Sequence, residues 1–210
     1  MKRPSGFFRL RPLELDLGDV LVQVVAVALG VILGLAATSW NERKHERALL
    51  QETVGNIVAE LSENQKGMRP VMAGHAKSEA VLTRLVLRSV GSRSISAAEG
   101  AKALRAIGPL HENVPLDIAW QIAQQDQGLR LLPYQDRYDL AGVYQVQAIY
   151  YRQEERFGNS MLTLTDPPNG NYFLEIVDLA NQLKSVVAIE NQLDGLYTKA
   201  IQRAKSEFNV

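Results

Sequence analysis

Glutamate and histidine three residues apart are the first pattern in this chain that could do chemistry. Glu42 and His45 have the spacing of the Glu-x-x-His pair found at di-metal centres in helical bundles. Such a centre needs a second pair, but Met and Gly stand three residues before the other histidines, His75 and His111. Glu42 and His45 also lie in a charged stretch, which favours a solvated helical turn. We therefore predict no metal ligands.

Other catalytic motifs are missing from the sequence. There is no Gly-x-Ser-x-Gly turn to support a triad, so residues 111–113 are interpreted as a polar loop. Carboxylates such as Asp117 and Asp126 occur in any chain of this length and do not by themselves indicate an acid–base pair. No glycine-rich phosphate loop is present, and cysteine is absent, which excludes thiolate chemistry. We predict a non-enzymatic protein without catalytic or cofactor-binding residues and without a cofactor.

Aromatic residues and one charge within an apolar helical pattern are the remaining candidates. Five tyrosines allow two interpretations, a small-ligand pocket between helices or a bundle core with hydroxyls at its edge, and the core is favoured. Glu190 lies in an apolar helical pattern near Val187 and Leu193, where it is expected to snorkel or to pair with an arginine of a neighbouring helix. The five tyrosines are Tyr134, Tyr138, Tyr144, Tyr150 and Tyr151.

Composition limits the class of protein that must position these groups. The chain has 210 residues, of which 46% are hydrophobic, so it can bury a core. Lys plus Arg and Asp plus Glu number 23 each, and the net charge is zero. Because nucleic-acid binding depends on neutralising phosphates, we expect no DNA or RNA partner.

An uncharged apolar run near the N-terminus predicts a membrane anchor. The run begins at Val20 and, with Thr38, Ser39 and Trp40, gives a span over residues 20–40 that would be about 30 Å long as a helix. A buried core helix of this length would show a polar stripe, and this one shows none. A cleaved signal peptide has a shorter apolar core, so an uncleaved signal-anchor is preferred. Trp40 is predicted to lie at the membrane interface.

Basic residues on either side of the span predict its orientation. Residues 1–19 form a short leader with four basic residues, against three that follow the span closely. The positive-inside rule then places the leader in the cytoplasm and the C-terminal domain outside it. The leader is too short to fold independently, so a sensor of this architecture would have to signal through a separate partner. The bilayer itself is the first expected partner.

Small residues recur every four positions in the span and predict a helix-packing face. Ala26, Gly30, Gly34 and Thr38 would form a flat strip along which two membrane helices approach closely. The pattern therefore predicts a homo-oligomer through the span, although Gly and Ala are also common in membrane helices that do not associate.

The remaining residues, 41–210, predict an all-α antiparallel bundle with coiled-coil-like seams. The apolar pattern continues beyond the span without a break until Gly67 and Pro70, where a kink or break is expected near Met68. Ser96 and Glu99 match a capping box that opens a short helix. Short helices are expected at 96–107 and at 116–127, the second ending at Gly128, and a long helix is expected at 172–208. Another long helix is expected after Pro133, followed by a connector at 158–171. The residues on one side of that helix are Tyr134, Tyr138, Ala141, Tyr144, Ala148 and Tyr151.

Two blocks of this sequence resemble a group of bacterial single-span helical proteins of uncharacterised function. The first is residues 37–42, Ala-Thr-Ser-Trp-Asn-Glu, at the end of the anchor. The second runs from Ala119-Trp120-Gln121 through residues 128–132 to Tyr134 and residues 140–144. The resemblance implies the same architecture and a bacterial inner-membrane location, and it implies no activity.

These observations predict a membrane-tethered module that binds a protein partner or scaffolds an assembly. The alternative is an extracytoplasmic small-molecule-sensing bundle, and a membrane-bound hydrolase ranks third. A ligand-sized cavity around Tyr144 and Trp120 would favour sensing, whereas a filled core with an exposed apolar patch would favour partner binding.

Overall fold

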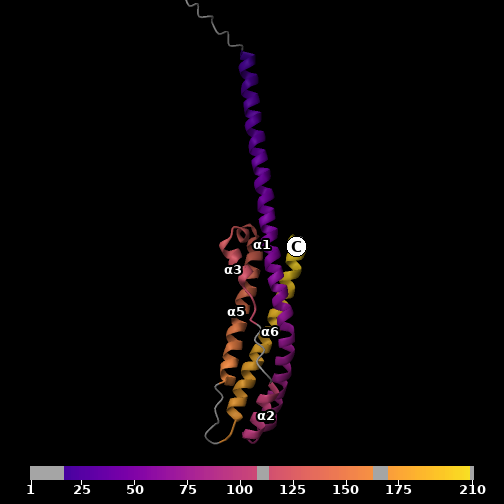
Figure 1. Cartoon of the computed structure of the whole chain (residues 1–210), viewed down its shortest axis with the longest axis vertical. Coiled ribbons are helices and arrows are strands. Elements are labelled where there is room, and N and C mark those ends of the chain that lie inside the picture. Colours follow the sequence, from indigo (N-terminus) through magenta and orange to yellow (C-terminus); the bar gives the residue numbers. More distant parts are fainter. Residues whose placement is uncertain (1–16, 108–113, 163–169, 209–210) are drawn as a thin grey trace, which may run out of the picture. The chain divides into compact units, whose positions relative to one another are not determined.

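Helices make up the whole of the regular structure. The computed structural model describes residues 17–107, 114–162 and 170–208, and it contains no strand within those ranges, so the predicted all-α class is confirmed (Figure 1). The helices are α1 (Leu17–Ser89), α2 (Ala97–Ile107), α3 (Ile118–Gln125), α4 (Gly128–Leu131), α5 (Tyr134–Leu162) and α6 (Phe173–Phe208).

The chain divides into two compact units between Arg47 and Ala48. In the N-terminal unit, α1 has a segment of mean hydropathy 2.7 that has no buried residue, and it is long and apolar enough to cross a membrane. Its large apolar side chains are exposed, with Leu33 at 68% and Trp40 at 76%. The kind of membrane and the orientation stay predictions.

Long-range contacts set the directions of the three long helices in the C-terminal unit. Glu60 of α1 contacts Tyr144 of α5, and His75, further along α1, contacts Phe157, further along α5. The two helices therefore run parallel. The partners on α6 move backward, so α6 is antiparallel to both, and it lies beside α5 (Figure 1). The predicted antiparallel packing therefore holds for α6, while the long crossover from α1 to α5 makes that pair parallel.

The core forms because each long helix carries apolar residues at steps of three and four. Leu61, Met68 and Leu82 of α1 are fully buried against Leu183 and Leu193 of α6. Burying such a side chain contributes about 1.5–3 kcal/mol, so these seams account for the association of the helices.

The buried face of α5 differs from the predicted one. Ala141, Ala148 and Tyr151 of the expected stripe are exposed, whereas Val143, Tyr150 and other residues face the core. The aromatic spacing was misleading because α5 also buries polar side chains that a hydrophobic pattern does not register. Its buried residues are Asp136, Val143, Tyr144, Gln147, Tyr150 and Phe157.

Two predicted helix ends are wrong. The helix does not break at Pro70, because α1 continues through it, and the nearby Met68 and Val71 are buried, so packing stabilises the helix despite the lost hydrogen bond; the alternative of a kink stays a prediction. Gly128 does not end a helix but begins α4, and the break falls at residues 126–127. α5 also extends through Leu162 into the predicted connector, most of whose remaining residues lie outside the described ranges.

The predicted capping box is confirmed at the start of α2. The backbone N–H of Glu99 donates to Ser96 Oγ at 3.3 Å, and the backbone N–H of Ser96 donates to Glu99 Oε2 at 3.1 Å. The Ser96 hydroxyl also donates to Glu99 Oε2 at 2.7 Å, and this bond, followed by the one from the Ser96 backbone N–H, holds the pKa of Glu99 below its usual range. Next to it, the buried Ile95 accepts a hydrogen bond from Tyr172 N–H at 3.0 Å, which ties this loop to the start of α6.

Candidate functional site

Four apolar side chains project from the segment that leads into α3 and from α3 itself. Val114 is 55% exposed, Leu116 46%, Ile118 57% and Ile122 55%. We call these four residues the apolar ridge. Exposed aliphatic side chains gathered over nine consecutive residues are unusual on a protein that has a well-filled core, and they mark a candidate interaction surface.

The backbone beneath the apolar ridge is held by buried polar side chains of α1 and α5. Asn64 donates to the carbonyl of Leu116 and accepts from its N–H, both at 2.7 Å. Glu60 Oε2 accepts from the N–H of Ala119 at 2.7 Å, and Gln147 donates to the carbonyl of Leu116 at 2.8 Å. Side chains that hydrogen-bond a neighbouring backbone this closely fix its conformation while its own side chains face outward.

Two tyrosines complete this polar layer from behind. Tyr144 donates to Glu60 Oε1 at 2.7 Å, and Tyr197 donates to Gln147 Oε1 at 2.7 Å. Burial raises the pKa of both hydroxyls, and the hydrogen bond to Glu60 raises that of Tyr144 further. Trp120 stacks on Tyr144 with ring centroids 4.9 Å apart, so α3 is anchored by one aromatic residue while its aliphatic residues stay exposed.

A groove flanks the apolar ridge on each side. The first, which we call the α1/α3 groove, has a volume of about 400 Å³, and the second, the α5 groove, about 320 Å³. Leu49, Glu52, Thr53, Asn56, Glu60, Leu116, Ile118, Ala119, Ile122, Ala123 and Asp126 line the α1/α3 groove. Val114, Pro115, Asp117, Tyr144, Gln147, Ala148, Tyr151 and Arg152 line the α5 groove.

The five candidate tyrosines separate into two groups. Tyr144 and Tyr150 are buried in the core, as the favoured interpretation requires, whereas Tyr134, Tyr138 and Tyr151 are exposed. Trp120 stacks on Tyr144, and Tyr144 also lines the α5 groove, so an open groove of about 320 Å³ lies beside this pair. The exposed pair Tyr134 and Tyr138 stack on each other with centroids 6.3 Å apart.

Glu190 is fully buried and pairs with a histidine rather than with an arginine. His75 Nδ1 lies 2.7 Å from Glu190 Oε1, and the hydroxyl of Tyr150 donates to the same oxygen at 3.5 Å. The other carboxylate oxygen has no hydrogen-bond partner among the described residues. Phe157 packs edge-on against the His75 ring, and both members of the pair are buried from the outer surface. The expectation of snorkelling is wrong, because Glu190 lies in the middle of α6.

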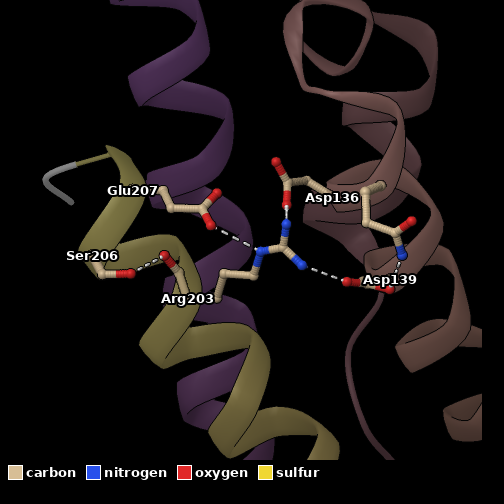
Figure 2. Close-up of polar contacts among 6 residues, drawn as sticks. Asp136, Asp139, Arg203, Ser206 and Glu207 are labelled. Carbon is tan, nitrogen blue, oxygen red and sulfur yellow. Dashed lines mark hydrogen bonds and ion pairs between the residues drawn. The ribbon is translucent and has the colours of Figure 1, made fainter.

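A second polar cluster joins the end of α6 to the start of α5. Arg203 contacts Asp136 at 2.6 Å, Asp139 at 2.7 Å and Glu207 at 3.0 Å with three different nitrogens (Figure 2). Burial raises the pKa of Asp136, and the Arg203 guanidinium opposes that shift. The contacts to Asp136 and Asp139 join α6 to α5, whereas the contact to Glu207 lies within α6, so Arg203 acts as a structural clamp between the two helices.

The predicted site residues of the anchor lie in the N-terminal unit. Ala26, Gly30, Gly34 and Thr38 are all exposed in the single chain, and Thr38 donates to the Gly34 carbonyl at 3.0 Å. A Cβ added at either glycine would meet no atom within 4 Å. Trp40 is exposed as an interface anchor would be, but nothing tests its role.

The metal-type pattern of the sequence stays without support. Within the described ranges, no group of three His, Asp or Glu side chains is placed to hold a metal ion. Glu42 and His45 are both exposed, and His111 lies outside those ranges.

Comparisons with protein-family models, curated proteins and solved structures gave no match to this chain. The resemblance to bacterial single-span proteins therefore stays a prediction.

The polar side chains that hold the backbone of the apolar ridge were not predicted from the sequence. Asn64 and Gln147 stand at core-facing positions of their helices, and a polar residue in such a position is the signal that would have indicated a buried hydrogen-bonding partner. The identity of that partner, the backbone of Leu116, is not readable from spacing because Asn64 is 52 residues away.

Proposed function

We propose that this chain is a membrane-anchored, non-enzymatic helical module that binds a protein partner through the apolar ridge. The supporting observation is the combination of a fixed backbone at Leu116 and Ala119 with exposed aliphatic side chains on both sides of it. Because this backbone is already ordered, the segment would lose little conformational entropy when a partner docks on it.

The anchor gives the proposed module its location. The apolar segment of α1 supports a single span, and the leader with four basic residues supports a cytoplasmic N-terminus. The proposal places the chain in the bacterial inner membrane with the bundle on the periplasmic side. The face formed by Ala26, Gly30, Gly34 and Thr38 adds a proposed route to homo-oligomers.

Site-specific photocrosslinking in intact membranes tests the partner. A benzophenone amino acid at Ile118 is expected to give a reproducible protein adduct, identified by mass spectrometry, whereas the same group at Leu174 is not. Leu174 is the matched control because it is also apolar and exposed, at 74%, but lies on α6. Adding Ile122→Ser to the Ile118 probe chain should remove the adduct. No defined adduct at Ile118, or equal adducts at both positions, would refute the proposal.

The alternative function is a small-molecule sensor that signals through a partner. Its supporting observation is the volume of the α1/α3 groove, about 400 Å³, which lies in the range of small-ligand sites. Partner binding is preferred because the groove is bordered by aliphatic side chains that are exposed to solvent. A thermal-shift screen with small molecules distinguishes the two, since only a sensor gains stability from a small ligand alone.

A further inference from the structure

One wall of the α1/α3 groove is a regular helical face. Leu49, Glu52, Thr53, Asn56 and Glu60 follow each other along α1 at steps of one to four residues and all line the groove. From Leu49 to Glu60 the face is about 16 Å long, or three helical turns. This length and shape suit a short helix packed alongside α1.

The opposite wall is apolar and rigid. Leu116, Ile118 and Ile122 of the apolar ridge line it together with two alanines of α3. Because the polar layer beneath fixes Leu116 and Ala119, the wall is formed before any partner arrives. Its aliphatic side chains require an apolar face on the occupant.

The charges that line this groove all have one sign. Glu52, Glu60 and Asp126 contribute carboxylates, and none of the lining residues is Lys or Arg. Glu60 is only 9% exposed, and its two oxygens accept hydrogen bonds from neutral donors. No ion pair to Glu60 occurs in the part of the chain that the structure describes. A largely buried carboxylate without a counter-charge, at the edge of an open groove, favours a cation there.

We infer that the α1/α3 groove binds a helix of the partner protein that has one apolar face and flanking lysine or arginine residues. This inference rests on the proposed function and names the chemistry of its partner. A lipid surface fits less well, because bacterial inner-membrane headgroups are largely anionic or zwitterionic and the groove presents three carboxylates.

Two designed helical peptides of about 14 residues, roughly four turns, test the inference. Both have the same leucine face; one has lysine and the other glutamate at its polar positions. The full-length chain, with a benzophenone at Ile122, is held in phosphatidylcholine nanodiscs. Empty nanodiscs measure peptide that binds lipid. The test variant is Glu52→Lys with Asp126→Lys, and the control is Glu63→Lys with Glu155→Lys, which changes net charge equally on exposed positions outside the groove.

The lysine peptide is expected to crosslink saturably at Ile122, and the glutamate peptide about 10-fold less, corresponding to about 1.4 kcal/mol. The test variant should reverse this preference and the control variant should keep it, with unchanged helicity by circular dichroism in both. The inference is overturned if the lysine peptide does not crosslink, if both peptides crosslink equally, if the two variants behave alike, or if the benzophenone labels lipid instead.

Failure of this inference is distinguishable from failure of the proposed function. A defined protein adduct at Ile118 in membranes, together with no charge preference among the peptides, would leave partner binding intact and reject only the cationic helix. Absence of an adduct at Ile118 would reject partner binding itself.

Discussion

A carboxylate without exposed surface, such as that of Glu190, costs several kcal/mol to bury unless neighbouring groups compensate its charge. His75 supplies the closest contact, at 2.7 Å, from a helix 115 residues away in sequence. The pair therefore couples α1 to α6 in the middle of the bundle. Because both side chains are buried from solvent, the pair is best explained as a structural contact.

Replacing His75 by Ala should destabilise the bundle by about 3–5 kcal/mol, because Glu190 loses its nearest partner. The double variant His75→Leu with Glu190→Met should be more stable than the single one, because it removes the uncompensated carboxylate as well. Urea unfolding of the full chain in detergent, followed by circular dichroism, measures both. If the double variant were the less stable, the pair would be worth more than its burial costs.

Buried tyrosine hydroxyls predict a loss of stability at alkaline pH. Burial raises the pKa of Tyr144, Tyr150 and Tyr197 in the folded bundle, whereas tyrosine in the unfolded chain ionises near pH 10. Above about pH 10 the unfolded state therefore binds fewer protons than the folded state, and stability falls as pH rises.

Each of these tyrosines contributes up to about 1.4 kcal/mol per pH unit to that loss. The Tyr197→Phe variant should show a shallower decline between about pH 10 and 11 than the parent, and the exposed Tyr138→Phe should show the parent's decline. Melting temperatures across the pH series measure the slopes. Identical slopes in all three chains would contradict the prediction.

At the scale of elements, α4 approaches α1 closely at Gly128. A Cβ added at Gly128 would lie 2.0 Å from Thr53 Oγ1 and 2.9 Å from Thr53 Cβ. Thr53 Oγ1 is itself bonded to the Leu49 carbonyl at 2.8 Å, so it cannot move without losing that bond. Because Thr53 and Leu49 also line the α1/α3 groove, this contact sets how α3 is placed beside it.

Gly128→Ala should therefore push α4 away from α1 and destabilise the bundle by about 1–3 kcal/mol, the usual cost of overpacking. Adding Thr53→Ala removes the nearest clash and should restore part of the loss. Chemical unfolding measures stability, and crosslinking at Ile122 reports the groove. A neutral effect of Gly128→Ala would mean that α4 is more loosely packed than its contacts indicate.

The predicted packing face of the anchor is testable because its residues are exposed in the single chain. A Cβ added at Gly30 or Gly34 meets nothing within 4 Å in the same chain, so a change caused by Gly30→Ile with Gly34→Ile is expected to report on a second chain. We expect a membrane dimerisation reporter fused to the span to lose most of its signal. Val27→Ile with Val31→Ile, outside the strip, is the control. An unchanged signal would reject self-association through this face.

At the scale of the whole molecule, we predict that the apolar segment of α1 holds the protein in a membrane because it is more stable among lipid chains than in water. Leu29→Lys with Leu33→Lys puts two charges in the predicted span, each costing about 2.5–3.5 kcal/mol at the bilayer centre. Most of the protein should then be lost from the carbonate-washed membrane fraction. The control variant, Glu63→Lys with Glu155→Lys at exposed positions, should stay in that fraction. Recovery of the unmodified chain in the aqueous fraction without detergent would refute the anchor.

Properties that depend on neighbouring residues were predictable from the sequence. The apolar run from Val20 and the capping box of Ser96 and Glu99 are examples, because solvation and capping act over one to four residues. The helices at 97–107 and 173–208 were expected within one residue of their observed starts. Pro70 was misjudged because packing of Met68 and Val71, which involves other helices, outweighs its local effect.

The candidate site was decided by tertiary structure. Asn64 and Leu116, Glu60 and Ala119, and His75 and Glu190 are pairs separated by 52, 59 and 115 residues. No spacing rule connects residues so far apart, since their contact depends on α1 and α5 running parallel and α6 antiparallel to both. The sequence alone thus determined the apolar segment of α1 and the helical class through local solvation and hydrogen bonding. Which side chains are buried, and which remain exposed as the apolar ridge, followed only from the packing of distant helices.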